Sequence, residues 1–252
     1  MTVNTAPLLR AIYWLQAGWY YFSANMLIWC ALSLLFFISM GILLIIPRIG
    51  IFILVLLFPV FFAGLLYSVY RSRCEMPPRV EDIVYGFSKP LHRRSLLRLG
   101  ALMLIYLFAL VLSFYPLSGA LFQYFYNIYG SEQQNLMQLK LIAEQFVQKH
   151  PLILWLQLLS VITGIAAFSY AIPLTLFERM SPLKAIMLSI QAFLHNLLPV
   201  CMLVGLSTIL MGLATLAFGL GFLIVLPVLA GANYASYREM FSAETENNMA
   251  AA

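Results

Sequence analysis

Residues 26–46 of the chain read MLIWCALSLLFFISMGILLII, and residues 49–70 read IGIFILVLLFPVFFAGLLYSVY. Neither stretch contains Asp, Glu, Lys or Arg, and each is long enough to cross the bilayer core, about 30 Å thick, as a helix. Only Pro47 and Arg48 lie between them. The two stretches are therefore predicted to form a tight transmembrane hairpin.

Four further uncharged stretches bring the predicted number of membrane spans to six: residues 99–117, 151–177, 196–217 and 219–237. Of the 252 residues, 9% are charged and 63% are hydrophobic, whereas soluble domains have about 25% charged residues. This composition excludes a soluble globular domain, a disordered chain and a nucleic-acid-binding domain. The predicted fold is an all-α transmembrane bundle of six helices, arranged as hairpins in a single integral membrane domain over 1–252.

The basic residues predict the orientation of the bundle, because Lys and Arg are retained on the cytoplasmic side of inner-membrane proteins. With the N-terminus inside, eleven of the fourteen Lys and Arg residues fall in cytoplasmic segments. The three on the opposite side are Arg48, Lys140 and Lys149. We therefore expect both termini to lie in the cytoplasm.

The sequence is predicted to contain an internal repeat, although apolar helices also resemble each other by composition alone. The pattern Phe22-x-x-Asn25 recurs as Phe193-x-x-Asn196, at an offset of 171 residues. Beyond the hairpin turn the offset falls to 167, and the series Gly64, Tyr67, Tyr70, Arg71 matches Gly231, Tyr234, Tyr237, Arg238. Both copies enter the membrane from the same side, so the repeat is predicted to be parallel.

The repeat divides the chain into three parts. Repeat A covers about 8–71, a middle hairpin about 80–178 and repeat B about 182–238, followed by a flexible tail over 239–252. The middle hairpin has its own preceding helix and a proline in its second span, so a diverged third copy is also considered.

Two helices are predicted to lie in the membrane plane ahead of the repeated hairpins. The segment 8–22 is almost entirely apolar, and the segment 182–195 begins at Pro182, which suits a helix start. In the second, an apolar face is formed by Leu183, Ile186, Ile190 and Phe193.

A third short helix is predicted over 80–88, in the longest cytoplasmic segment. Its apolar face is formed by Val80, Ile83, Val84 and Phe87, at i, i+3, i+4 and i+7.

The loop over 118–150 is the only sizeable polar segment on the opposite side. Ser131 and Gln134 have the spacing of a capping box, and a short amphipathic helix is predicted after them. This helix is expected either to cap the third and fourth spans or to form a docking surface or lid.

A basic stretch precedes the third span and contains Lys89, Arg93, Arg94 and Arg98. Basic residues beside a membrane attract anionic lipid headgroups by about 1 kcal/mol each. These four residues are candidates for contact with anionic lipid or a partner, although fixing the orientation would also explain them.

Three prolines are predicted to kink the second spans of the hairpins: Pro59, Pro173 and Pro227. A helical proline leaves one carbonyl without its usual donor. Together with Asn233, the prolines are candidates for lining a cavity, and an interhelical hydrogen bond is the simpler role for the asparagine.

Motifs that carry chemistry are missing from the sequence. There is no HExxH or GxSxG motif, and the three cysteines form no CxxC pair. No predicted span has an ionisable residue at its centre, which disfavours proton-coupled transport. We therefore expect no enzyme activity, no metal site and no bound cofactor.

The chain resembles a family of six-span inner-membrane proteins of proteobacteria, classed as a domain of unknown function. The resemblance rests on Gly18-Trp19-x-x-Phe22, Pro47-x-x-Gly50, Pro59-x-x-x-x-Gly64 and Gly86-Phe87, and it is clearest over 10–110. It implies a bacterial inner membrane and no particular activity.

These observations lead to two functional expectations. The first is a non-enzymatic accessory or scaffold protein for a membrane complex or for lipid organisation. The second is a pore or carrier for lipid or a small solute between the repeated hairpins. The expected partners are the bilayer, anionic lipids, and a membrane protein or a second copy of the chain, but not nucleic acid.

Overall fold

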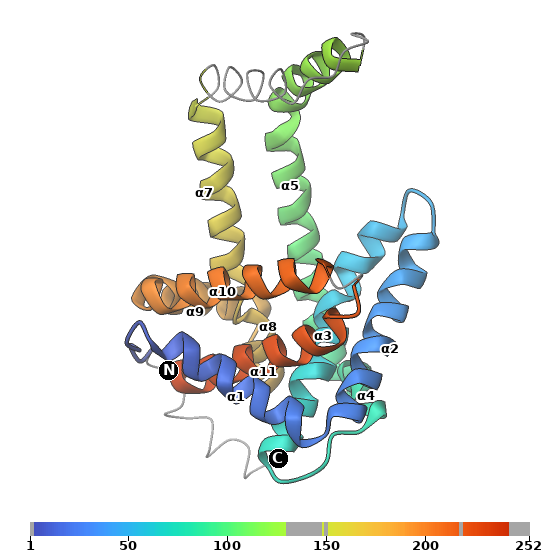
Figure 1. The fold of residues 1–252 in the computed structure, drawn as a ribbon, viewed down its shortest axis with the longest axis vertical. Coiled ribbons are helices and arrows are strands. Elements are labelled where there is room, and N and C mark those ends of the chain that lie inside the picture. Colours follow the sequence, from blue (N-terminus) through green and yellow to red (C-terminus); the bar gives the residue numbers. More distant parts are fainter. Residues whose placement is uncertain (1–2, 130–147, 149–150, 217–218, 242–252) are drawn as a thin grey trace. The chain divides into compact units, whose positions relative to one another are not determined.

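The computed structural model describes residues 3–129, 148, 151–216 and 219–241, and these are 86% helical with no strand among them. The helices are α1 (Arg10–Ala24), α2 (Met26–Ile45), α3 (Gly50–Arg73), α4 (Tyr85–Ser88), α5 (Pro90–Tyr129), α7 (Pro151–Phe168), α8 (Ala171–Phe177), α9 (Pro182–His195), α10 (Leu197–Leu216) and α11 (Phe222–Phe241), with a 3-10 turn η1 (Val80–Val84) (Figure 1).

Within the described residues, five helical segments are long and apolar enough to cross a membrane: Met26–Ile45, Gly50–Arg73, Pro90–Ser113, Leu154–Phe177 and Leu197–Leu216. The prediction of an all-helical membrane protein is confirmed at this level. The sixth predicted span, 219–237, corresponds to α11, which is not among the five. The polar residues of α11 explain this, because the helix contains Asn233 and carries Arg238 and Glu239 in its last turns.

Some predicted boundaries differ from the observed ones. The fourth span is interrupted, since α7 ends at Phe168 and α8 begins at Ala171. The tail predicted from 239 begins as helix, because α11 continues to Phe241, and 242–252 lie outside the described residues. The loop predicted over 118–150 begins as the last turns of α5, and its capping box and amphipathic helix also lie outside the described residues.

The chain forms two compact units, and the smaller one comprises Leu104–Ile165. Within it, parts of α5 and α7 are joined by polar contacts. The Tyr106 hydroxyl donates to the Ser160 carbonyl, and the Gln157 amide donates to Ser113 Oγ at 2.9 Å.

The larger unit, Met1–Met103 with Ala166–Ala252, is built around α3, α8 and α11. Helix α3 packs against both of the others. The Phe177 ring of α8 lies 5.5 Å from that of Tyr234 and 5.9 Å from that of Tyr237, both on α11. We call α3, α8 and α11 the central helices.

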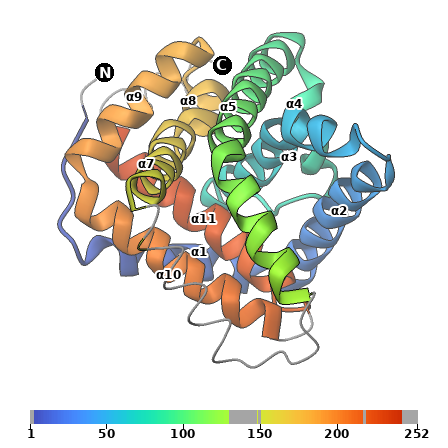
Figure 2. The same cartoon turned by 90° about the horizontal axis from the view of Figure 1, so that it is seen from above.

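Each central helix carries one short helical segment on its surface. Helix α1 packs along α11, η1 with α4 packs on α3, and α9 packs on α8 (Figure 2). Helix α2 lies beside α3 and α11, and α10 lies beside α11.

Small residues allow two of these crossings to be very close. A Cβ atom on Gly18 of α1 would stand 2.1 Å from the Val228 carbonyl oxygen of α11, and one on Gly86 of α4 would stand 2.5 Å from that of Val60 in α3. These distances are shorter than any van der Waals contact. Only glycine therefore fits at either position without movement of the backbone.

The predicted faces of the short segments are partly wrong. In the 80–88 segment, Ile83 is buried, but Val80 and Val84 are exposed and the buried positions include Asp82 and Gly86. The reason is that its first half is a 3-10 turn, which repeats every three residues rather than every 3.6.

In α9, the residues that face the protein are mostly small. Ala185 and Ser189 are completely buried, whereas Leu183 is 63% exposed. Among the predicted apolar positions, Phe193 is buried against the protein.

Candidate functional site at the arginine-rich helix ends

The central helices end beside one another in a cluster of aromatic rings. Tyr70 of α3 lies 5.8 Å from Phe177 of α8, and Tyr237 of α11 lies 5.6 Å from Phe241. Tyr234, Tyr237 and Phe241 are at most 1% exposed. Rings at these distances pack favourably, so the cluster fixes the three helix ends relative to one another.

Arginines follow this cluster on every central helix: Arg71 and Arg73 on α3, Arg179 just after α8, and Arg238 on α11. A cation near a helix C-terminus is favoured by the helix dipole. We call this region, together with the start of α5, the basic end.

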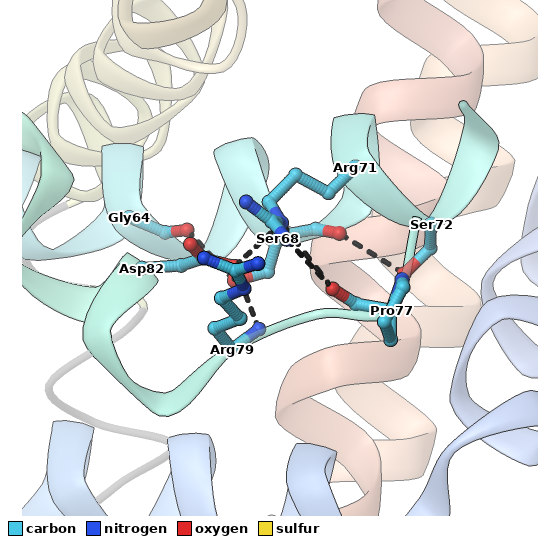
Figure 3. A network of polar contacts seen from close by, with 7 residues as sticks. All are labelled: Gly64, Ser68, Arg71, Ser72, Pro77, Arg79 and Asp82. Carbon is cyan, nitrogen blue, oxygen red and sulfur yellow. Dashed lines mark hydrogen bonds and ion pairs between the residues drawn. The ribbon is translucent and has the colours of Figure 1, made fainter. Parts of the chain in front are cut away.

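Arg71 belongs to a buried network around Asp82 (Figure 3). Asp82 is 6% exposed; its Oδ2 accepts a hydrogen bond from the Arg79 backbone N–H at 2.8 Å and lies 3.4 Å from Arg71 Nε. Arg71 also donates to the Pro77 carbonyl at 3.1 Å, and Ser68 donates to Asp82 at 3.4 Å. The network holds the 74–82 loop against α3, so its role is structural.

Glu239 of α11 holds the N-terminal helix. Its Oε1 accepts from Arg10 Nε at 2.7 Å and its Oε2 accepts from Trp14 Nε1 at 2.8 Å. The preceding segment is also fixed, because the Asn4 N–H donates to the Met240 carbonyl and the Asn196 side chain accepts from the Ala6 N–H at 2.7 Å.

An open depression of about 270 Å³ lies where α1, α3 and α11 meet, and its lining residues are Tyr21, Arg73, Tyr234, Ala235, Arg238 and Glu239. We call it the arginine niche. The Tyr234 hydroxyl is buried and has no hydrogen-bond partner among the described residues, and Arg73 lies near it. Burial raises the pKa of the Tyr21 phenol, against the opposing effect of the nearby Arg73 and Arg238. Tyr21 is therefore a neutral donor at physiological pH.

A second depression, of about 600 Å³, lies between the end of α8 and α9, and its lining includes Arg179, Lys184, Met187, Leu188 and Gln191. Arg179 adopts a left-handed backbone conformation, with φ of 52°. Within the described part of the chain, neither Arg179 nor Lys184 forms an ion pair or a side-chain hydrogen bond.

The predicted basic stretch lies at the start of α5. Lys89, Arg93, Arg94 and Arg98 are all exposed. The structure also brings this stretch close to the α8 end, because Lys89 and Arg179 both act electrostatically on His92. No sequence pattern indicated this proximity.

Two of the residues predicted to line a cavity, Pro173 and Asn233, lie at the same place in the fold. Pro59, Pro173 and Pro227 are buried, and α3 and α11 continue through their prolines. Pro173 has no N–H for the Ser169 carbonyl four residues earlier, and the Asn233 side chain donates to that carbonyl at 3.0 Å. Asn233 thus makes the interhelical hydrogen bond, across the break between α7 and α8.

Ser189 of α9 also forms hydrogen bonds with the backbone at this break. Its hydroxyl donates to the Ala166 carbonyl at 2.7 Å and accepts from the Tyr170 N–H at 3.1 Å. It therefore stands between the two backbone groups that an unbroken helix would pair directly.

Among the residues that the structure describes, no group of three or more His, Cys, Asp and Glu could hold a metal ion. His150 lies outside these residues, and the exposed His195 ring bonds the Gln191 carbonyl at 2.9 Å.

Sequence reasoning missed the arginine niche. Tyr234 and Arg238 could have been grouped, because the repeated Tyr-x-x-Tyr-Arg pattern places its first and last residues on one helix face. Nothing in the sequence connects Tyr21 with Arg73.

Comparison of the chain with protein-family models, with curated proteins and with solved structures finds no match.

Proposed function

We propose that the protein is a non-enzymatic integral protein of a bacterial inner membrane that organises anionic lipids, or a membrane complex, at its basic end. The observation that carries this proposal is a set of exposed cations that have no partner among the described residues. Lys89, Arg93, Arg94, Arg98, Arg179 and Lys184 form no ion pair or side-chain hydrogen bond with another described residue.

The position of these cations supports an interaction with a partner other than the protein itself. Basic residues in the first turns of a helix oppose the helix dipole, so Arg93 and Arg94 do not stabilise α5. An anionic surface beside the basic end offsets that cost, at about 1 kcal/mol per basic residue.

The packing of the central helices favours a scaffold over a pore or carrier. Val60, Leu66, Ala171, Leu174 and Ala230 are completely buried. The break next to Pro173 has its backbone groups bonded by Ser189 and Asn233. The break next to Pro173 is thus accommodated by protein contacts.

The proposal includes six spans, with α11 as the sixth and the basic end in the cytoplasm. It also includes the parallel repeat. In its support, the N–H groups of Asn25 and Asn196 both bond the carbonyl three residues earlier, at Phe22 and Phe193. Both bonds lie at the junction of a short helix with a span.

The middle hairpin is proposed to be a third copy of the repeat, because its short segment packs in the same way as those of the other two copies. Its short segment, η1 with α4, packs on α3 as α1 packs on α11 and α9 packs on α8. In two of the three crossings, a glycine packs against the carbonyl of the residue that follows a proline. Gly18 packs against the Val228 carbonyl, and Gly86 packs against the Val60 carbonyl. We propose that each short segment covers the central helix of a neighbouring copy.

Reconstitution in lipid vesicles separates the two candidate functions. We expect no protein-dependent movement of a fluorescent phospholipid between leaflets and no release of a trapped small solute. Movement or release that increases with the amount of protein would favour the carrier.

A further inference from the structure

We propose that the depression between the end of α8 and the start of α9 binds a zwitterion with one phosphate and one primary ammonium group, as in the headgroup of phosphatidylethanolamine. This inference goes beyond the proposed function, because it assigns a ligand without net charge to two of the six exposed cations, Arg179 and Lys184. The other four cations come from residues 89–98 and do not line this depression.

Charges of both signs line the depression without pairing with each other. Arg179 and Lys184 are exposed cations, and Glu178, the residue immediately before Arg179, supplies a carboxylate. Among the described residues, no ion pair joins Glu178 to either cation, and neither cation has another ionic partner. A ligand that carries both signs of charge would attract all three groups, whereas a purely anionic ligand would be repelled by Glu178.

The carboxylate of Glu178 is oriented by a buried side chain. Its Oε1 accepts a hydrogen bond from the Tyr237 hydroxyl at 2.8 Å, and Tyr237 is completely buried. The second oxygen, Oε2, has no hydrogen-bond partner within the described part of the chain. A primary ammonium group has three N–H donors for this oxygen, whereas the trimethylammonium group of phosphatidylcholine has none. The site is therefore expected to distinguish these two headgroups.

The phosphate of the ligand is expected at the start of α9. The guanidinium group of Arg179 suits phosphate oxygens through paired N–H donors, and Lys184 adds an ammonium. Ser181 precedes α9 and lines the depression, and its side chain makes no capping hydrogen bond. Its hydroxyl is thus available as a further donor. The dipole of α9 also favours an anion at this end of the helix.

The depression is open, which suits a lipid because its acyl chains must leave the headgroup site. Met187 and Leu188 of α9 contribute an apolar part of the lining. Leu183, Met187 and Leu194 lie on one face of this helix, at i, i+4 and i+11, and they are 63%, 62% and 66% exposed. Acyl chains can therefore lie along this face of α9 while the headgroup occupies the depression.

Native mass spectrometry of the full chain in detergent tests the proposal, with phosphatidylethanolamine, phosphatidylcholine of the same acyl chains and soluble phosphoethanolamine as separate probes. We expect one adduct of phosphatidylethanolamine, bound about tenfold more tightly than phosphatidylcholine, as expected for a hydrogen bond to a charged group. An adduct of this lipid identifies a membrane headgroup as the ligand, and an adduct of phosphoethanolamine alone identifies a soluble zwitterion; either supports the site. Absence of both adducts, or equal binding of the two lipids, would overturn it.

Variants locate the adduct. Glu178→Gln keeps the shape of the side chain and an acceptor for the Tyr237 hydroxyl but removes the charge, so it should weaken phosphatidylethanolamine by about tenfold and phosphatidylcholine much less. Arg179→Gln with Lys184→Gln should weaken both lipids by about tenfold or more. The control Glu81→Gln removes an exposed carboxylate that does not line the depression, and it should keep the preference. A preference that survives Glu178→Gln, or is lost equally in the control, contradicts the proposal.

The test can fail separately from the proposed function, because neither probe lipid carries a net charge. If the preference for phosphatidylethanolamine depends on Glu178 and no anionic lipid gathers at the basic end, the scaffold proposal fails and this site is supported. If anionic lipid gathers there and Glu178→Gln changes nothing, this site is rejected and the proposed function is retained.

Discussion

Gly18 of α1 and Gly231 of α11 meet backbone to backbone, because a Cβ atom on Gly231 would stand 2.6 Å from the Cα of Gly18. Membrane helices associate through such small-residue contacts, since lipid is as apolar as the protein interior and provides no hydrophobic driving force. This contact joins the first and the last of the described helices, α1 and α11.

The first prediction concerns this crossing. Gly18→Val should destabilise the protein by about 1–3 kcal/mol or more, because the new side chain overlaps the Val228 carbonyl. Thermal unfolding in detergent measures the effect. Gly41→Val in α2 is the matched control, since a Cβ atom there meets nothing within 4 Å. Equal unfolding temperatures for the two variants would contradict the observed packing.

The second prediction concerns the buried Asp82 network. Asp82→Ala should cost about 3–5 kcal/mol, because it leaves Arg71 without its ionic partner in a site where both side chains are largely buried. The neighbouring Glu81→Ala should change stability by less than about 0.5 kcal/mol, because Glu81 is exposed. Proteolysis within the 74–82 loop should also become faster in Asp82→Ala. A loop that stays resistant would show that other contacts hold it.

The third prediction concerns the break between α7 and α8. Ser189→Ala removes the hydroxyl that stands between the Ala166 carbonyl and the Tyr170 N–H, and unsatisfied buried groups cost about 1–3 kcal/mol. Ser207→Ala provides the comparison, because the Ser207 hydroxyl bonds only the Leu203 carbonyl of its own helix. We expect a clear loss of stability in the first variant and little change in the second. The reverse order would mean that the break does not depend on α9.

The fourth prediction concerns orientation. Cys74 is an exposed cysteine at the basic end. With Cys30 and Cys201 replaced by serine, a membrane-impermeant maleimide should label it in inverted membrane vesicles and not in intact spheroplasts. A reporter fused at Gln138 should be active outside the cytoplasm. Labelling of Cys74 from outside would reverse the proposed topology.

The sequence predicted the helical membrane character of the chain well, for a physical reason. A helix that crosses lipid must be long and uncharged whatever its neighbours are, so 26–46 and 49–70 could be recognised in isolation. The predicted span over 219–237 is not among the five apolar segments of the described residues, because protein contacts cover Tyr234 and Tyr237 and permit polar residues there.

The faces of the helices could not be predicted in the same way. In a membrane protein, hydrophobicity does not separate the buried face from the lipid face. Leu183 is therefore 63% exposed, while Ala185 and Ser189 on the same helix are completely buried. Small size, rather than hydrophobicity, marks the contact surface of α9.

The arginine niche depends on tertiary contacts that no local pattern encodes. Tyr21, Arg73 and Arg238 come from three helices that are far apart in the sequence. The hydrogen bond between Asn233 and Ser169 likewise joins residues 64 positions apart. The sequence analysis named Pro173 and Asn233 as separate candidates. Only the folded structure places both residues at the break between α7 and α8.

The central claim is that the basic end gathers anionic lipid, and lipid analysis of native nanodiscs tests it most directly. The protein is extracted with its surrounding lipid, and the fraction of anionic phospholipid is compared with that of the whole membrane. We expect enrichment that is lost in Lys89→Gln, Arg93→Gln, Arg94→Gln and retained in the matched triple variant Arg48→Gln, Lys140→Gln, Lys149→Gln. No enrichment in the unmodified protein, or equal loss in both triple variants, would contradict the claim.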